Sequence, residues 1–156
     1  PISQQVVHWA GTRATLLMTE EVLPLASPML LNGRRRWTPK DVAQLPLLQQ
    51  STRPEAWRQW FEAMGVDAPR ALAGPRYELF SMLAVAAAQG MGVALMPRML
   101  AEAELTRGEL QVVCERPVRA QRGYYLVTPD GIDRPAVSAF RAWLVDQAAT
   151  AASTTI

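Results

Sequence analysis

The sequence predicts an α/β protein, and three stretches of the chain support this prediction. Residues 83–97 (LAVAAAQGMGVALMP) have the pattern of an apolar helix, a glycine turn at Gly90, a short buried strand and a proline that begins the next helix. Before this stretch, a strand at 47–50 precedes a helix with aromatic residues at helical spacing. After it, a helix at 97–105 precedes a strand at 110–114. Strands that alternate with helices are typical of a mainly parallel sheet covered by helices on both faces.

The first part of the chain predicts three short strands. Residues 2–9 alternate in polarity and end at Trp9, before a turn at Gly11. Two further strands are expected at 16–18 and 22–26. Because proline has no amide to donate, Pro24 predicts that the last of these lies at a sheet edge or in a crossover.

Several helices are predicted from their end signals. Ser27-Pro28 begins a short helix that runs to Leu31, and Thr38-Pro39 begins another that runs to about Leu45. Thr52 and Glu55 have the spacing of a capping box for the aromatic helix. The remaining expectations are a strand at 70–73, a turn at 74–75, a helix at 77–89, a loop at 116–123, a strand at 123–127, a helix at 135–147 and a disordered tail at 151–156.

Composition and charge argue against several classes of function for this chain. Hydrophobic residues make up 49% and charged residues 19%, which suits a globular domain. The net charge of +2 is too small to indicate nucleic-acid binding by this chain, and Arg34-Arg35-Arg36 is expected to be a solvated loop. The single cysteine, Cys114, excludes an internal disulfide and a cysteine-based zinc site within this sequence.

Catalysis finds little support in the sequence, so we expect no enzyme, no metal and no cofactor. His8 is the only histidine, and no Gly-x-Ser-x-Gly motif supplies a nucleophile elbow. Gly90-Met91-Gly92 follows a helix and precedes a strand, which is the reverse of the order in a dinucleotide fingerprint. Glu20-Glu21 and the pair Glu102 and Glu104 have no converging partner in sequence that would complete a metal site.

Ligand binding is better supported, because open α/β sheets bind small molecules beyond the carboxyl ends of their strands. Here these ends are expected at Ser51-Thr52, at Pro75-Arg76-Tyr77 and at Met96-Pro97. Arg76 is suited to hold a carboxylate, and Tyr77 to close over an apolar or ring portion of the ligand. Thr52 also has a purely structural interpretation, since helix capping alone accounts for it.

The chain also carries a family resemblance. The motif at 83–97 is preceded by Pro46-Leu47-Leu48 and by Trp57-Arg58-Gln59-Trp60-Phe61, and followed by Tyr124-Tyr125-Leu126-Val127 and by the helix sequence at 135–144. These segments, in this order, resemble the effector-binding domain of LysR-type transcriptional regulators. The resemblance runs from about Leu16 to Ala148.

The resemblance implies a periplasmic-binding-protein-like architecture of two Rossmann-type lobes, with an effector in the cleft between them. Residues 1–25 and 125–150 would form a partial first lobe, and residues 26–124 the complete second lobe. Crossover or hinge positions are expected at Ala26, Ser27, Tyr125 and Leu126. The expected effector contacts are Trp9, Ser51, Thr52, Pro75, Arg76, Tyr77 and Tyr125.

The chain departs from the family pattern at its beginning. No counterpart is present for about one βαβ unit of the first lobe, roughly 30 residues or more, or for the helix-turn-helix domain. We therefore expect a fragment of a cytoplasmic regulator that contacts DNA only through a domain outside this chain and pairs with another copy. A solute-binding receptor of a transport system, which shares the bilobal architecture, is the main alternative.

Overall fold

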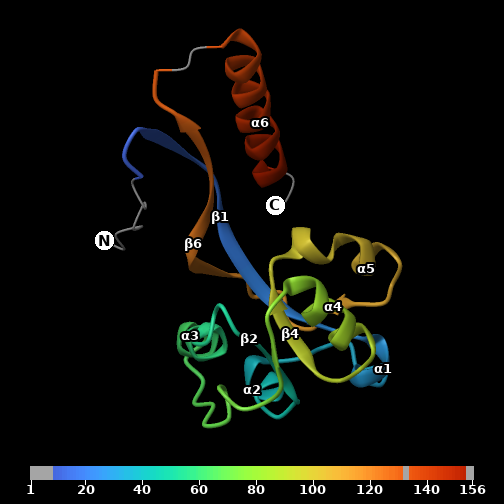
Figure 1. Ribbon diagram of the computed structural model, residues 1–156. Coiled ribbons are helices and arrows are strands. Elements are labelled where there is room, and N and C mark those ends of the chain that lie inside the picture. The colour runs from blue at the N-terminus through green and yellow to red at the C-terminus, as the bar shows by residue number, and fades with distance from the viewer. Residues whose placement is uncertain (1–8, 132–133, 154–156) are drawn as a thin grey trace. The chain divides into compact units, whose positions relative to one another are not determined.

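The computed structural model describes residues 9–131 and 134–153, and these residues form two compact units (Figure 1). One unit contains the chain up to Glu20 together with the chain from Arg119 onward, and the other runs from Glu21 to Val118. The divisions therefore fall inside two long strands, β1 (Thr12–Ala26) and β6 (Val118–Pro129). They lie a few residues before the lobe boundaries expected at 25/26 and 124/125. No helix among the described residues has the length and apolar character needed to cross a membrane.

The second unit is built on a sheet with the strand order β3-β2-β4-β1-β5. Strands β2 (Leu47–Gln50), β3 (Arg76–Tyr77) and β4 (Val93–Met96) run parallel, whereas the second half of β1 is antiparallel to β4 and to β5 (Gln111–Val112). All four residues of β2 and all four of β4 are buried, as expected for central strands covered on both faces.

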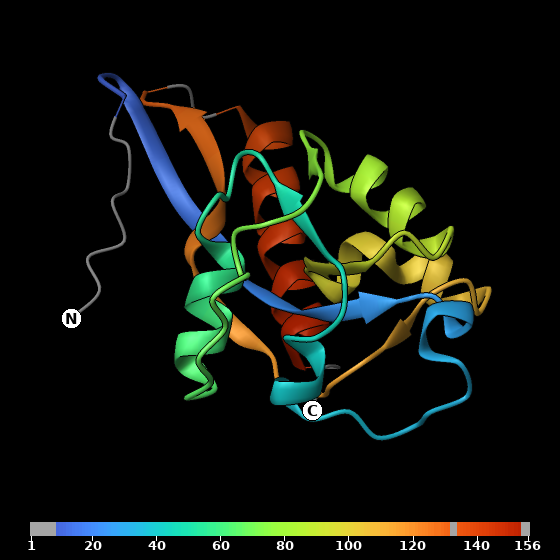
Figure 2. The same cartoon turned by 90° about the horizontal axis from the view of Figure 1, so that it is seen from below.

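Helices cover both faces of this sheet, which confirms the predicted α/β class (Figure 2). Alternate residues of each strand point to opposite faces, so Leu47 and Val93 pack with α3 (Ala56–Ala63), and Leu48 and Ala94 with α4 (Phe80–Ala88). The other helices of the unit are α1 (Pro28–Leu31), α2 (Pro39–Val42), the 3-10 helix η1 (Arg98–Ala101) and α5 (Glu102–Thr106).

Helix α3 carries the aromatic part of the core. Trp57, Trp60 and Phe61 are buried, and their ring centroids lie 5.1–5.8 Å apart. The two indole N–H groups donate to backbone carbonyls, Trp57 to Leu48 at 2.9 Å and Trp60 to Arg116 at 2.9 Å. These bonds satisfy the polar atoms that burial of tryptophan would otherwise leave unpaired.

The short helices α1 and α2 begin where their caps predict. Ser27 Oγ accepts from the amide of Leu30 at 3.2 Å, and Asn32 ends α1 with a left-handed φ of 47°. Thr38 and Asp41 form a capping box at the start of α2, which ends at Val42 and not at Leu45.

The capping box predicted for α3 is wrong. Residues 51–55 form turns, in which Arg53 donates its amide to Gln50 O at 3.0 Å, and the helix begins only at Ala56. Glu55 therefore cannot reach back to the Thr52 amide, and its carboxylate instead pairs with Arg58.

The first unit pairs β6 with the first half of β1 and adds α6 (Pro135–Ser153). Gly123 allows the two strands to approach closely, because a Cβ there would lie 2.8 Å from Leu16 Cδ1. Tyr124 donates its hydroxyl to the buried carboxylate of Glu20 at 3.2 Å. Among the described residues of this unit, only Glu20 and Ala148 are classed as fully buried.

Three expectations about the long strands and the C-terminal helix are corrected. Residues 16–18 and 22–26 belong to one continuous strand, β1. The loop expected at 116–123 lies mostly within β6, whose pairing with β1 depends on a strand more than a hundred residues away. The expected tail at 151–156 begins inside α6, which continues to Ser153, and residues 154–156 lie outside the described residues, as does most of the predicted strand at 2–9.

Pro24 lies in the middle of the sheet and not at an edge. It is paired with Leu95 of β4, and β5 lies on its other side. Its carbonyl accepts from the amide of Val113 at 2.9 Å. Because the N and C=O of a strand residue point the same way, the missing donor faces the side of β5, just past the end of that two-residue strand.

Candidate functional site

The carboxyl ends of β2, β3 and β4 lie at the same edge of the sheet, because the three strands are adjacent and parallel. The amide of Ser51, directly after β2, donates to the carbonyl of Tyr77 at the end of β3 at 2.9 Å. The structure therefore brings two of the predicted site residues together through their backbones. Small ligands of open α/β sheets bind at edges of this kind.

The turn that follows β2 presents polar side chains at this edge. Ser51 and Thr52 are exposed, and Thr52 donates its amide to the side-chain carbonyl of buried Gln50 at 3.3 Å. Arg53 donates to the hydroxyl of Thr52 at 2.9 Å, and its guanidinium lies 4.6 Å from the ring centroid of Phe80, the first residue of α4. Arg53 was not among the residues predicted from the sequence; the available signal was a basic residue just beyond a predicted strand end.

The segment before β3 is fixed to β2 by one buried side chain. Gln49 is 2% exposed, and its amide nitrogen donates to the carbonyls of Ala71 at 3.0 Å and Ala73 at 2.8 Å. Gly74 follows with a φ of 121°, and a Cβ there would lie 2.1 Å from the carbonyl oxygen of Leu47, so only glycine fits. The backbone of Gln49 then donates to Pro75 O at 2.8 Å, which starts the β2–β3 ladder.

This ladder corrects the expected arrangement of Arg76 and Tyr77. Residues 70–73 form a turn, Arg76 and Tyr77 form β3, and the following helix begins at Phe80. Neighbouring strand residues point to opposite faces. Tyr77 packs with the α4 side of the core, and its hydroxyl lies 3.8 Å from Met91 Sδ.

The sequence predicted Arg76 at the start of a helix, but it lies in an edge strand. Its side chain is exposed and has no ion-pair or hydrogen-bond partner in the part of the chain that the structure describes. At the end of β4, Pro97 is buried, and the next residue, Arg98, pairs with Glu115. This pairing leaves Arg98 less suited to an anionic ligand.

The remaining predicted contacts, Trp9 and Tyr125, belong to the first unit. Trp9 is 59% exposed, and its carbonyl accepts from the amide of Thr12 at 3.1 Å. Tyr125 is half-buried in β6. Leu126 lies beside it in the same unit, whereas Ala26 and Ser27 lie inside the second unit, as the end of β1 and the cap of α1. The hinge assignment of these four residues stays a prediction.

Among the described residues, no group of metal-ligating or nucleophilic side chains gathers at this edge. No cluster of three metal-ligating side chains occurs within residues 9–131 and 134–153. Burial raises the pKa of the Cys114 thiol, which favours its unreactive protonated form. His8 lies outside the described residues.

The family of the chain follows from comparison with known proteins. Residues 2–149 match the model of the LysR substrate binding domain. The chain belongs to this family. Among curated LysR-type relatives, the glycine cleavage system transcriptional activator of Escherichia coli K12 is 31% identical over 144 residues, covering 91% of this chain and 47% of the relative. The activator AmpR of Rhodobacter capsulatus is 38% identical over 144 residues, with 90% and 47% covered. This LysR-family chain thus spans about half the length of these relatives.

Solved structures show the same LysR effector-domain fold. The effector domain of AmpR from Pseudomonas aeruginosa has a TM-score of 0.78 and 28% identity, with 94% of this chain and 70% of that chain covered. The AmpR effector-binding domain from Citrobacter freundii has a TM-score of 0.75 and 25% identity, with 92% and 70% covered. The periplasmic-binding-protein-like fold class predicted from the sequence is confirmed.

Proposed function

We propose that this chain is the effector-binding part of a LysR-type transcriptional regulator and binds a small carboxylate at the shared edge of β2, β3 and β4. The observation that carries the proposal is the alignment of these three strand ends, where Ser51 and Thr52 are exposed and Arg53 lies over Phe80. A guanidinium beside two hydroxyl groups is suited to a carboxylate. The ring of Phe80 offers an apolar surface next to it.

The chemistry of the edge favours binding without reaction. It combines hydroxyl groups, a guanidinium and an aromatic ring, and the relatives named above are transcriptional activators. They do not support the alternative of a transport-type solute receptor. In a longer regulator, an effector acts by binding one arrangement of the protein more tightly than another. DNA contact through a separate domain, pairing with another copy and a cytoplasmic location complete the proposal.

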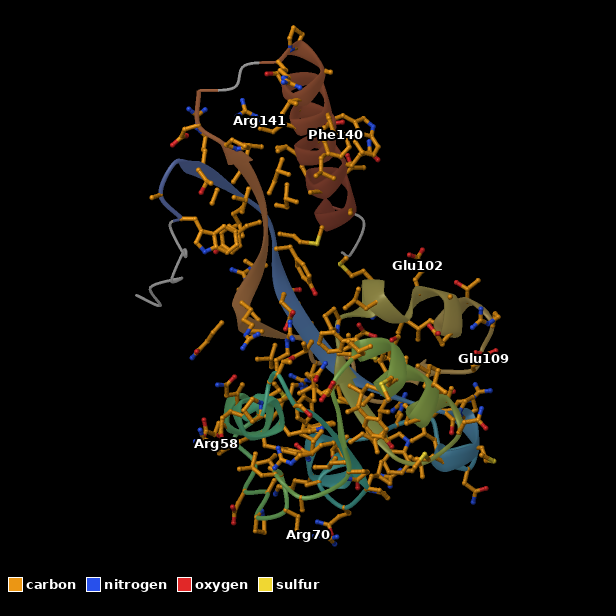
Figure 3. The ribbon with its side chains drawn as sticks, in the orientation of Figure 1. Arg58, Arg70, Glu102, Glu109, Phe140 and Arg141 are labelled. Atoms are coloured by element: carbon orange, nitrogen blue, oxygen red, sulfur yellow. The ribbon has the colours of Figure 1, made fainter. Side chains whose placement is uncertain are left out.

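Isothermal titration calorimetry with this chain and a panel of organic carboxylates and amino acids tests the site. We expect at least one compound to bind, and Arg53→Ala to weaken it about tenfold or more, because a charge-assisted hydrogen bond contributes roughly 1.5–3 kcal/mol. Arg70→Ala is the matched control, since Arg70 is exposed in the turn after α3 (Figure 3).

Arg76→Ala separates the sequence-based expectation from the structure-based one. Arg76 is exposed on an edge strand, next to Tyr77 but directed to the other face. A loss with Arg76→Ala and none with Arg53→Ala would move the carboxylate contact to the α3 side of the sheet. Equal affinity in wild type and both variants would remove this edge from the site. Trp9, Pro75, Tyr77 and Tyr125 stay predicted contacts, to be tested in the same titration.

A further inference from the structure

Helix α6 in the first unit directs its side chains in an unusual way. Phe140 and Trp143 are 54% and 56% exposed, whereas Ser138 and Arg141 are only partly exposed. Figure 3 shows Phe140 and Arg141 leaving the helix on different sides, with Arg141 on the side of the β1–β6 strands. A helix that covers strands normally turns its apolar residues inward. Here the inward face carries a guanidinium and a hydroxyl group in addition to the partly buried Leu144 and the buried Ala148.

Two adjoining hollows in this unit share these inward side chains. One, of about 280 Å³, is lined by Arg13 of β1, Thr128 of β6, and Ser138 and Arg141 of α6. The other, of about 720 Å³, is also lined by Arg13, Ser138 and Arg141, with Thr15 in addition. The same two arginines therefore line both hollows, although they are far apart in the sequence.

The charges of Arg13 and Arg141 have no partner within the described part of the chain, where neither forms a hydrogen bond or an ion pair. Asp130 lines the smaller hollow and Asp146 the larger, yet neither pairs with them. Four other arginines of this chain do have a partner. Arg34, Arg58, Arg98 and Arg107 each pair with a nearby carboxylate.

We infer that Arg13 and Arg141 form a binding site for a small anion with two negative charges, of the phosphate or dicarboxylate class. Two guanidinium groups that face one space match such a ligand, since each can donate two parallel hydrogen bonds to its oxygens. Ser138 lines both hollows, Thr128 the smaller one and Thr15 the larger one, and their hydroxyl groups suit the remaining oxygens. The site lies wholly in the first unit and does not depend on the strand-end site of the second unit.

Titration of this chain with sodium phosphate and with sodium succinate tests the inference, with sodium acetate and sodium chloride at matched ionic strength as controls. The readout in wild type is the NMR signal of the arginine side-chain Nε–Hε groups. We expect the Arg13 and Arg141 signals to shift and saturate together with phosphate, succinate or both, and the response to each anion identifies the class. Equal shifts with chloride would overturn the inference.

Variants provide the second measurement. Arg13→Gln and Arg141→Gln should each weaken binding of the active anion about tenfold or more, whereas Arg122→Gln, an exposed β6 arginine that lines neither hollow, should not change it. Binding unchanged in both variants would also overturn the inference. Circular dichroism verifies folding; if a variant does not fold, the wild-type NMR titration decides the question. Arg53→Ala should leave this anion binding intact. A failure of the anion-site inference can therefore be distinguished from a failure of the strand-end site.

Discussion

Gly74 occupies a position at which the backbone tolerates no side chain. Its φ of 121° and the 2.1 Å distance from an added Cβ to Leu47 O mean that any side chain collides with the backbone of β2. We expect Gly74→Ala to lower the free energy of unfolding by about 3 kcal/mol or more, as measured by urea denaturation. Gly65→Ala is the control, because Gly65 has a φ of 65° and open space around it, and should cost only about 1 kcal/mol. Similar losses in both variants would contradict the collision.

Gln49 is a second residue with a specific task. Gln49→Leu keeps the volume but leaves the carbonyls of Ala71 and Ala73 without their donor, so we expect a loss of about 2 kcal/mol in the free energy of unfolding. Gln44→Leu, at an exposed position, should change it by about 0.5 kcal/mol or less. If Gln49→Leu is as stable as wild type, the two bonds do not hold this segment.

The lowered pKa of Asp41, at the start of α2, should make the stability of the protein depend on pH. The backbone amide of Thr38, then its hydroxyl group and Arg34, lower the pKa of Asp41 from 3.8 to about 2. Because the pKa is lower in the folded state, the stabilisation is present above the unfolded value and is lost as the pH falls through about 2. Urea midpoints of wild type and Asp41→Asn measured between pH 2 and 6 should therefore converge at the acidic end. A difference that stays constant over this range would contradict the prediction.

Helix α3 shows how burial decides the cost of losing an aromatic ring. Trp60 is 0% exposed and donates to Arg116 O, so we expect Trp60→Ala to lower the free energy of unfolding by about 4 kcal/mol. Trp143 of α6 is 56% exposed, and Trp143→Ala should cost about 0.5 kcal/mol or less. Thermal denaturation of the two variants gives the comparison. A large loss with Trp143→Ala would show that a partner, such as a second copy, covers α6 in solution.

The elements that sequence patterns predicted well are those with local signals. Ser27-Pro28 and Thr38-Pro39 cap their helices themselves, and the short segments 47–50 and 93–96 need no distant partner to be recognised as strands. The elements that were missed depend on distant contacts. Strand β6 exists because β1 pairs with it, and β3 exists because β2 supplies its ladder.

The candidate sites divide in the same way. Ser51 and Thr52 follow a predictable strand, so their position at the sheet edge could be inferred from the sequence. Arg53 lies in the turn after β2, whereas Phe80 begins α4, so no local pattern predicts that the guanidinium lies over this ring. Arg13 and Arg141 are brought together only by the packing of the first unit.

At the scale of the whole molecule, the two units differ in how they are stabilised. The second unit has a sheet with a hydrophobic core on each face, whereas the described part of the first unit has few fully buried side chains. We expect the amides of β4 to exchange with solvent much more slowly than those of β6 from Arg119 onward. Hydrogen–deuterium exchange followed by mass spectrometry compares the two strands in one sample. Equal protection would show that the units open together.

The contacts of Gln49 have a consequence for how this chain tolerates change in length. One amide side chain takes the place of a strand, since it ties the turn at 71–73 to β2 where no backbone ladder exists. Extra residues after Asp67 would loop into solvent and leave that tie intact. A single residue inserted between Ala71 and Gly74 would break these hydrogen bonds and shift the register of Arg76 and Tyr77 against β2. Such an insertion should also disrupt the ligand site at this edge.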